Sequence, residues 1–361
     1  MKKILVITNM YPSKKYPHYG IFIKNTVNLL KENGYKVNVV SMPKHDFVVL
    51  KALDYVIFYA LAIFKGIFGG YHYIYGHYVS HIVIPVKVIH RFKPKIKIIL
   101  NVHGNDIIIE EEWMYKNEKR SASILPLASK VVAPSKYFKK QLMQLYNVPE
   151  DKIVLYPSGG INLNTFYKQD SISAKKALGL DPNINYIGYV SRVDAHKGWE
   201  IFVQMAKELT LKNDPRKFIL VGSGDQDSQL DALIKENHLE DIIIRFPLID
   251  QQKLAYVYNS LEYFIFPTYR KSESLGLVGL EAMACGCICI VANNFGPTSY
   301  VVDGENGYFF ESKSMVNLVH RIESIDKLSD EQKTKIKTIA LKTAQQFDVN
   351  TTAKQILKVF E

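Results

Sequence analysis

The sequence KSESLGLVGLEAMACG, at residues 271–286, combines the end of a loop with a short helix. It follows an apolar run at 263–267 that is typical of a buried parallel strand, and residues 277–284 contain few helix breakers before Gly286. Glu273 is therefore expected in the strand-to-helix loop and Glu281 on the helix. A strand, a loop and a helix in this order form the repeating unit of a parallel α/β sheet.

The start of this helix has the features of an anion site. Peptide dipoles favour an anion beside the first N–H groups of a helix, which here belong to Ser274, Leu275, Gly276 and Leu277. Helical side chains lean toward the helix N-terminus, so the carboxylate of Glu281 is expected beside the same anion. Two carboxylates around a phosphate cradle fit a sugar nucleotide, although an ordinary capped helix with two surface glutamates would show the same pattern.

The run ESLGLVGLEAMACG resembles the Glu-x7-Glu signature of the retaining GT-B glycosyltransferases of family 4. It is similar to the bacterial members that act in capsule, teichuronic acid or exopolysaccharide synthesis. The resemblance implies that Glu273 contacts the donor sugar and that Glu281 contacts the nucleotide ribose. It also implies an α/β fold of the GT-B type, with two doubly wound Rossmann-like domains that face each other across a cleft.

The rest of the chain alternates between strand-like and helix-like segments, which predicts parallel sheets with crossover helices. The expected strands form two series separated by a turn cluster at 157–160. They are 4–8, 35–41, 72–75, 96–102, 130–133 and 152–156, and then 186–190, 218–221, 242–246, 263–266 and 288–291.

These series and the resemblance together predict the domain organisation. We expect an N-terminal acceptor-side domain at 1–165, a linker at 166–183 and a C-terminal nucleotide-sugar-binding domain at 184–349. The resemblance further implies that a last helix at 350–361 packs back on the first domain.

Two basic residues follow the first strand of the second series. Residues 190–198, VSRVDAHKG, resemble the family's Gly-Arg…Lys-Gly segment, with Ser191 at a position where Gly is common. The resemblance implies that Arg192 and Lys197 neutralise the donor diphosphate and stabilise the departing nucleoside diphosphate. The alternative is a pair of solvated loop cations.

Two segments of the first domain resemble the sugar and acceptor side of the family. His103, in VHGND at 102–106, matches the His of a His-Gly segment beside the donor sugar; its alternative is a structural histidine at a strand end. Asp106 is a second candidate, or a helix cap. Tyr19 and Gly20 match a loop in which many members carry Gly-Gly. The acceptor-binding residues implied in this way are Tyr19, Gly20, His103 and Asp106, and the catalytic ones are Glu273, His103, Lys197 and Arg192.

The sequence also departs from the family pattern. Residues 293–300 read NNFGPTSY where the family usually has two glycines followed by a Glu, and here only Gly296 is clear. This departure concerns the sugar side of the pocket and leaves the phosphate cradle unchanged.

The net charge of +11 is unevenly distributed. Residues 1–160 contain 23 Lys and Arg against 10 Asp and Glu, whereas the rest contains 23 against 25. We expect no nucleic-acid partner, because no reader motif is present. An anionic membrane surface or a polyprenyl-diphosphate-linked acceptor fits better, and a lysine-rich surface that only reflects genome composition is the alternative. The apolar segment 46–70 is expected as a buried crossover helix or as a helix that contacts the membrane interface.

Several other patterns bear on cofactors and location. Asp225-Gln226-Asp227 has the form of a metal-binding Asp-x-Asp but begins a helix, where carboxylates are favourable. The cysteines at 285, 287 and 289 and the histidines at 77 and 81 also lack a full ligand set. We therefore expect no metal and no cofactor other than the nucleotide sugar. The expected nucleotide is UDP. The absence of a signal peptide and of a disulfide framework favours a cytoplasmic protein, located in the cytosol or at the inner face of the membrane.

These observations favour a retaining, metal-independent hexosyltransferase that acts in cell-surface polysaccharide synthesis. A GT-B sugar-nucleotide epimerase and a non-catalytic GT-B partner protein are the alternatives. A nicotinamide oxidoreductase would need G-x-G-x-x-G after a strand, and the first strand is instead followed by a loop without that pattern.

Overall fold

The protein is described here as a computed structural model that covers residues 1–17, 19–44 and 48–361. Contacts within the chain divide it into two compact units. The first comprises Met1–Gly159 together with Asn350–Glu361, and the second comprises Gly160–Val349.

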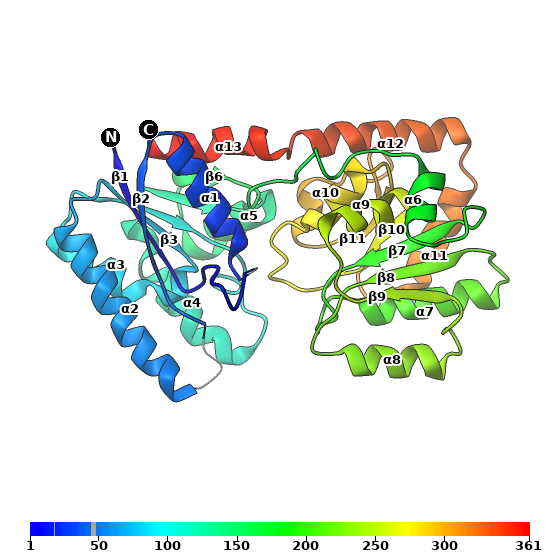
Figure 1. Ribbon diagram of the computed structural model, residues 1–361, viewed down its shortest axis with the longest axis horizontal. Helices are drawn as coiled ribbons and strands as arrows, with labels where there is room; N and C mark the ends of the chain where they lie inside the picture. The colour runs from blue at the N-terminus through cyan, green and yellow to red at the C-terminus, as the bar shows by residue number, and fades with distance from the viewer. Residues whose placement is uncertain (18, 45–47) are drawn as a thin grey trace. The chain divides into compact units, whose positions relative to one another are not determined.

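The first unit contains a six-stranded parallel sheet (Figure 1). In spatial order its strands are β2 (Lys36–Ser41), β1 (Lys3–Thr8), β3 (Tyr73–His77), β4 (Lys97–Asn101), β5 (Lys130–Ala133) and β6 (Ile153–Leu155). Its α-helices are α1 (Ile21–Glu32), α2 (Val48–Phe68), α3 (Val83–Phe92), α4 (Tyr115–Ala122), α5 (Lys136–Tyr146) and α13 (Val349–Leu357). The strand order changes direction between β1 and β3, which is where ligands bind in doubly wound sheets.

Helices cover both faces of this sheet. Side chains of α1 pack on one face together with Ile356 and Phe360 from the end of the chain, and α2, α3 and α5 pack on the other. The ring of Phe360 makes edge contacts with Tyr73 and Tyr75, at centroid distances of 5.5 and 5.2 Å. The last residues of the chain therefore complete the core of the first unit.

The second unit contains another six-stranded parallel sheet (Figure 1). Its strands, in spatial order, are β12 (Tyr308–Phe310), β11 (Ile288–Ala292), β10 (Leu261–Phe266), β7 (Tyr186–Val190), β8 (Lys217–Val221) and β9 (Ile243–Phe246). Its α-helices are α6 (Ser171–Ala177), α7 (Trp199–Leu211), α8 (Asp227–Glu236), α9 (Gln251–Ser260), α10 (Leu277–Ala284), α11 (Met315–Asp326) and α12 (Asp330–Gln345). Helices α7, α8 and α11 pack on one face, and α9, α10 and α12 on the other.

The prediction of two doubly wound α/β sheets is confirmed, with two differences in detail. Strand β12 was not expected, because its three residues carry too short a signal beside the loop that precedes them. Residues 166–183, expected as a linker, include α6 and belong to the second unit, because Phe166, Ala174 and Leu180 are buried in its core.

The apolar segment 46–70 forms α2 from Val48 onward, and residues 46 and 47 lie outside the described part of the chain. The histidines weighed as a helical metal pair are separated by the fold. His77 ends β3, whereas His81 lies in a 3₁₀ turn and contacts Tyr55 through a 2.6 Å hydrogen bond. No helix among the described residues has the length and apolar character needed to span a bilayer.

Candidate functional site

The predicted donor residues gather at one edge of the second sheet. Strands β7 and β10 are neighbours there, with β8 and β9 beyond one of them and β11 and β12 beyond the other. The strand order therefore changes direction between β7 and β10, and the loops that follow these strands leave the sheet side by side. Arg192 and Lys197 lie in the loop after β7, and residues 273–276 lie in the loop after β10.

The two loops are locked against each other by their backbones. Gly198 has a φ of +76°, and a Cβ atom at this position would lie 2.2 Å from the carbonyl oxygen of Pro267. The N–H of Tyr269 donates to the carbonyl of His196 at 2.9 Å. The hydroxyl of Tyr189 donates to the carbonyl of Lys197 at 3.4 Å. The position of Lys197 is thus set by contacts on both sides of its loop.

Lys197 and Glu273 form an ion pair across the two loops. The distance from Nζ to Oε2 is 2.6 Å, and the side chains are only 11% and 12% exposed. Burial by itself would raise the pKa of Glu273, but the ammonium of Lys197, followed by the Arg270 guanidinium, holds this pKa below its usual value. The carboxylate is therefore ionised at neutral pH and able to accept hydrogen bonds from hydroxyl groups.

Helix α10 begins directly beside this pair. Gly276 precedes it with a φ of +81°, and a Cβ atom there would lie 2.5 Å from the ring of Phe266. The carbonyl of Gly276 accepts a hydrogen bond of 2.9 Å from Tyr300. Because the first N–H groups of a helix have no partner within it, the α10 start offers donors and a positive dipole end to an anion.

Glu281 lies one turn into α10. Its Oε2 accepts a 3.0 Å hydrogen bond from the hydroxyl of Tyr258 on α9. Burial raises the pKa of Glu281 to about 7, and the hydrogen bond from Tyr258 opposes this rise. Glu273 and Glu281 are therefore two carboxylates on one loop–helix segment with opposite pKa shifts.

Arg192 has a different environment. Its side chain is 63% exposed and forms an ion pair with Asp194 in the same loop. Asp194 also accepts a 3.2 Å hydrogen bond from the N–H of Asp225. The structure thus joins Lys197 to Glu273 and directs Arg192 to Asp194.

In the first unit, His103 lies after β4 among aromatic rings. Its ring stacks on His77, with a centroid distance of 5.2 Å and an interplanar angle of 14°. Phe22, in the first turn of α1, and Tyr78, after β3, contact it at 5.0 and 4.7 Å. His103 Nε2 and His77 Nδ1 are 2.9 Å apart and share one proton.

The surroundings of His77 indicate which ring donates. His77 is 1% exposed, and its Nε2 is buried with no hydrogen-bond partner among the residues that the structure describes. A buried N–H without an acceptor costs about 1–3 kcal/mol, so the favoured tautomer carries the His77 proton on Nδ1. His77 then donates to Nε2 of His103, whose own proton must sit on Nδ1. His103 consequently offers an N–H donor on the side away from His77.

The other predicted acceptor residues have unequal environments. Asp106 is 2% exposed, and its carboxylate accepts hydrogen bonds from the N–H groups of Val79, His103 and Gly104 at 3.2, 3.0 and 2.8 Å. These hydrogen bonds join the loop after β3 to the loop after β4. Gly20 begins α1 with a φ of +76°, and Tyr19 is half-buried beneath the ammonium of Lys44.

Comparisons with known proteins assign a family to each unit. The model of glycosyl transferases group 1 matches residues 170–342, and the model of glycosyltransferase family 4 matches residues 4–160. The Anabaena protein HepE, in a crystal structure with UDP and glucose, is 19% identical, with a TM-score of 0.76 over 100% of this chain and 99% of that one. Models of two glycosyltransferase families thus match the two units, and the fold is of the GT-B type.

Two curated relatives illustrate the range of the match. A D-inositol 3-phosphate glycosyltransferase of Mycobacterium sp. (strain JLS) is 30% identical over 205 residues, which is 55% of this chain and 45% of the relative. The chain thus spans less than half the length of that relative. An uncharacterized glycosyltransferase of Methanocaldococcus jannaschii is 23% identical, over 91% of this chain and 89% of its own.

The departure at 293–300 has a clear geometry in the structure. Phe295 has a φ of +53°, a backbone conformation that glycine adopts without cost. A Cβ atom on Gly296 would lie 2.7 Å from both Glu273 O and Leu275 N. Gly296 therefore permits the close approach of this loop to the start of α10, and Phe295 occupies the neighbouring position at some cost in backbone strain.

Several residues that contact the predicted site residues carry no recognisable pattern in the sequence. Tyr258 is 23 residues from Glu281 and on another helix, and Arg270 is a loop cation that no motif singled out. His77 was weighed only as a metal ligand. The order of the elements sets the contacts of Tyr258 and His77, whereas Arg270 lies three residues before Glu273 in the same loop, so its proximity was visible in the sequence.

Proposed function

We propose that this glycosyltransferase moves a hexose from a UDP-sugar to a hydroxyl group of a glycan or a polyprenyl-diphosphate-linked acceptor, with retention of configuration and without a metal. The observation that carries this proposal is the Lys197–Glu273 pair beside the start of α10. It combines a cation, an ionised carboxylate and helix N–H donors where doubly wound sheets bind ligands. UDP is proposed because HepE was crystallised with UDP and glucose.

Each group has a proposed role in the reaction. The α10 N–H groups and Lys197 hold the diphosphate and stabilise the negative charge that develops on it as the bond from the anomeric carbon to the phosphate oxygen breaks. Glu273 orients the donor-sugar hydroxyls, and Glu281 accepts from the ribose. Arg192, which is exposed beside Asp194, would have to leave that partner to reach the diphosphate.

Retention needs no side-chain nucleophile in this scheme. The acceptor hydroxyl attacks the anomeric carbon on the face from which the diphosphate leaves, and the leaving phosphate oxygen takes the hydroxyl proton. His103 donates from Nδ1 to a sugar hydroxyl. Synthesis of a bacterial cell-surface polysaccharide is the proposed setting, supported by the basic first half of the chain and by analogy with the family.

A donor screen tests the proposal. Thermal unfolding would be followed with UDP-glucose, UDP-galactose, UDP-N-acetylglucosamine and GDP-mannose, in the wild type and in the Lys197→Met and Glu273→Gln variants. One UDP-sugar should raise the melting temperature of the wild type, and both variants should lose the effect. Lys235→Met and Glu236→Gln, exposed on α8, serve as matched controls.

Product analysis separates the alternatives. The selected donor, incubated alone, should give back only donor and slow hydrolysis products, whereas an epimerase would convert it to a second nucleotide sugar. A protein that binds no nucleotide sugar, or whose binding survives Lys197→Met, would contradict the proposed site.

A further inference from the structure

Helix α2 has one side fixed in the core of the first unit. Phe58 and Ala62 are buried, and the hydroxyl of Tyr59 donates to the carbonyl of His81 at 3.1 Å. A Cβ atom on Gly66 would lie 2.4 Å from Ile89 on α3, so the two helices are in close contact there. The orientation of α2 is therefore determined, and its opposite side faces solvent.

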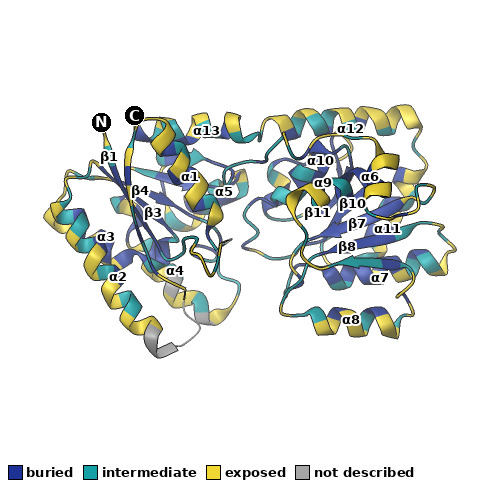
Figure 2. Ribbon diagram, in the orientation of Figure 1, coloured by how far each residue is buried: buried dark blue, intermediate teal, exposed yellow. Residues whose placement is uncertain are grey.

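That opposite side is apolar. Its spacing, with steps of three, four or seven residues, places the large side chains along one face of the helix, and Figure 2 shows this side as exposed. Phe64 and Phe68 are 63% and 73% exposed, with their rings in contact at 5.2 Å. The α2 outer face consists of Leu53, Val56, Ile57, Leu61, Phe64 and Phe68.

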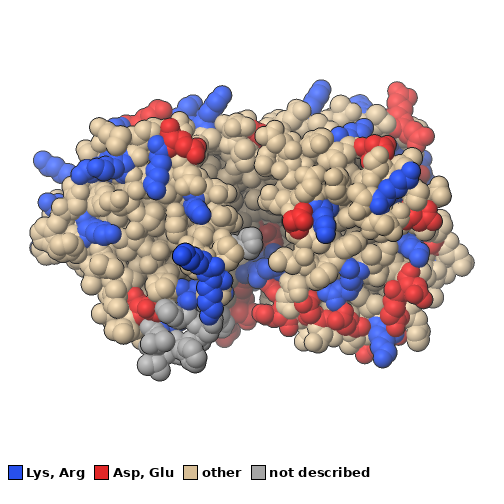
Figure 3. Space-filling view, viewed as in Figure 1, with Lys and Arg blue, Asp and Glu red and all other residues tan. Residues whose placement is uncertain are grey.

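The segment of the chain that contains this face is basic. From residue 48 to residue 97 the sequence contains seven Lys and Arg and a single acid, Asp54. The charged groups over the first unit are mainly Lys and Arg in the view of Figure 3. Helix α3, which packs against α2, carries two further exposed apolar residues, Ile84 and Phe92.

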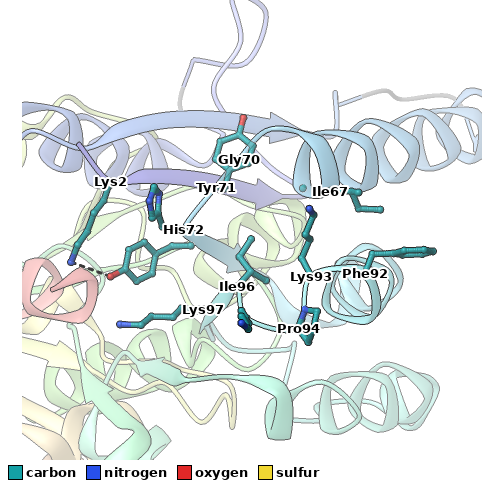
Figure 4. A pocket seen from close by; sticks show the side chains of 13 residues that line it. Lys2, Ile67, Gly70, Tyr71, His72, Phe92, Lys93, Pro94, Ile96 and Lys97 are labelled. Carbon is teal, nitrogen blue, oxygen red and sulfur yellow. Dashed lines mark hydrogen bonds between the residues drawn. The ribbon is translucent and has the colours of Figure 1, made fainter.

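A basic pocket lies where α2 and α3 end (Figure 4). It has a volume of about 670 Å³, and its walls combine Ile67 and Phe92 with several lysines. The ammonium of Lys2 already has a hydrogen-bond partner within the protein, because it donates to the Phe360 carbonyl at 3.0 Å. Lys93 and Lys95 are exposed at the rim. The pocket thus joins an apolar wall to cations at the C-terminal end of α2.

We propose that the α2 outer face and the basic pocket dock on an anionic lipid bilayer. The apolar side chains enter the interface between headgroups and acyl chains, and Lys93 and Lys95 contact headgroup phosphates. Charge decides against a second copy of the chain, because a two-fold contact would bring the same cations together. A nucleic acid would meet the cations but would leave the large aliphatic and aromatic side chains exposed.

Vesicle co-sedimentation of the full chain tests this proposal. The protein should bind vesicles of phosphatidylglycerol and phosphatidylcholine, and should bind pure phosphatidylcholine far more weakly. Binding should weaken with added salt, since screening reduces the attraction between the lysines and the lipid. Equal binding to both vesicle types, or no binding by the folded protein, would overturn the proposal.

Paired variants locate the surface. Phe64→Glu with Phe68→Glu should abolish binding, whereas Leu211→Glu with Leu248→Glu, at exposed positions of the second unit, should leave it unchanged. Each of Lys93→Gln and Lys95→Gln should lower the partition coefficient about fivefold, and Lys207→Gln should not.

Circular dichroism checks that each variant is folded, so that loss of binding is not loss of structure. Retention of binding by the folded double phenylalanine variant would overturn the assignment. Light scattering measures the oligomeric state of the protein and tests whether a second copy binds this face. A dimer that Phe64→Glu dissociates would show that a second copy covers this face instead. UDP-sugar binding is measured in parallel, and its loss or retention bears only on the proposed function.

Discussion

The ammonium of Lys197 and the carboxylate of Glu273 lie 2.6 Å apart although 76 residues separate them in the sequence. Each belongs to a loop that follows one of two adjacent strands, β7 and β10, and each side chain is nearly buried. The pair therefore couples the phosphate side of the proposed donor site to the sugar side. The ion pair is expected to affect both the free energy of unfolding and the free energy of donor binding. These two quantities can be measured separately.

Replacing one partner of the Lys197–Glu273 pair should destabilise the protein more than replacing both partners. Lys197→Met leaves the Glu273 carboxylate buried without its cation, so we expect a loss of about 3–5 kcal/mol in the free energy of unfolding. The double variant with Glu273→Gln should recover most of this loss, because no buried charge is left uncompensated. Urea unfolding of the four proteins measures the coupling. If the two losses simply add, the ion pair does not hold these loops together.

Glu281 should make donor binding depend on pH. Burial raises its pKa to about 7, above the unfolded value, so Glu281 stabilises the fold at low pH and this contribution is lost as pH rises through about 7. Ribose hydroxyls donate to the ionised form, so the affinity for UDP-glucose should increase over the same range.

Calorimetry with UDP-glucose, whose diphosphate diester does not titrate near neutral pH, provides the measurement. Glu281→Gln should make the affinity independent of pH, and Glu236→Gln should behave as the wild type. A wild-type affinity that is constant across this range would show that Glu281 does not contact the ribose.

Gly198 should tolerate no side chain. Alanine there would adopt a φ of +76° and place its Cβ 2.2 Å from Pro267 O, so the two loops would have to separate. Gly304 has a similar φ of +74° with no atom within 4 Å, and Gly304→Ala should cost only about 1–2 kcal/mol. Gly198→Ala should cost at least about 2 kcal/mol more and abolish donor binding. Equal urea midpoints for the two variants would contradict the close packing of the loops.

His77 should set the tautomer of His103. Burial lowers the pKa of His103 to about 3, so its ring stays neutral, and the proton on His77 Nδ1 leaves the His103 proton on Nδ1. Long-range proton–nitrogen NMR should detect this tautomer in the wild type. In His77→Phe the proton should move to Nε2 of His103. A wild-type His103 that is protonated on Nε2, or that titrates near its ordinary pKa, would refute the assignment.

Much of the fold could be predicted because its signals are local. Apolar runs of four to seven residues, separated by helical segments, predicted eleven of the twelve strands that the structure describes, since the burial of both sheet faces leaves such runs in the sequence. Strand β12 was missed because three residues at a sheet edge leave little pattern. The turn residues in and before 166–183 predict a linker, whereas the packing of α6 against α9 cannot be seen in the sequence.

The candidate site was predictable only in part, for a related reason. Local sequence patterns and the family resemblance predict Lys197, Glu273, Gly276 and Glu281 as donor residues. They did not show that Arg192 pairs with Asp194 or that Tyr258 donates to Glu281. They also did not show that the Asp106 carboxylate accepts hydrogen bonds from backbone N–H groups. Side-chain partners from distant segments depend on strand order and on the rotamers that burial allows.

The sequence by itself determined the strand–loop–helix units, the uneven charge and the position of Gly276 at a helix start, because each depends on residues that are neighbours in the chain. Only the tertiary structure decided which loops meet, which carboxylate is ionised and which side of α2 faces solvent. Those properties follow from burial and from the order of strands in the sheets. Contacts between distant residues create both.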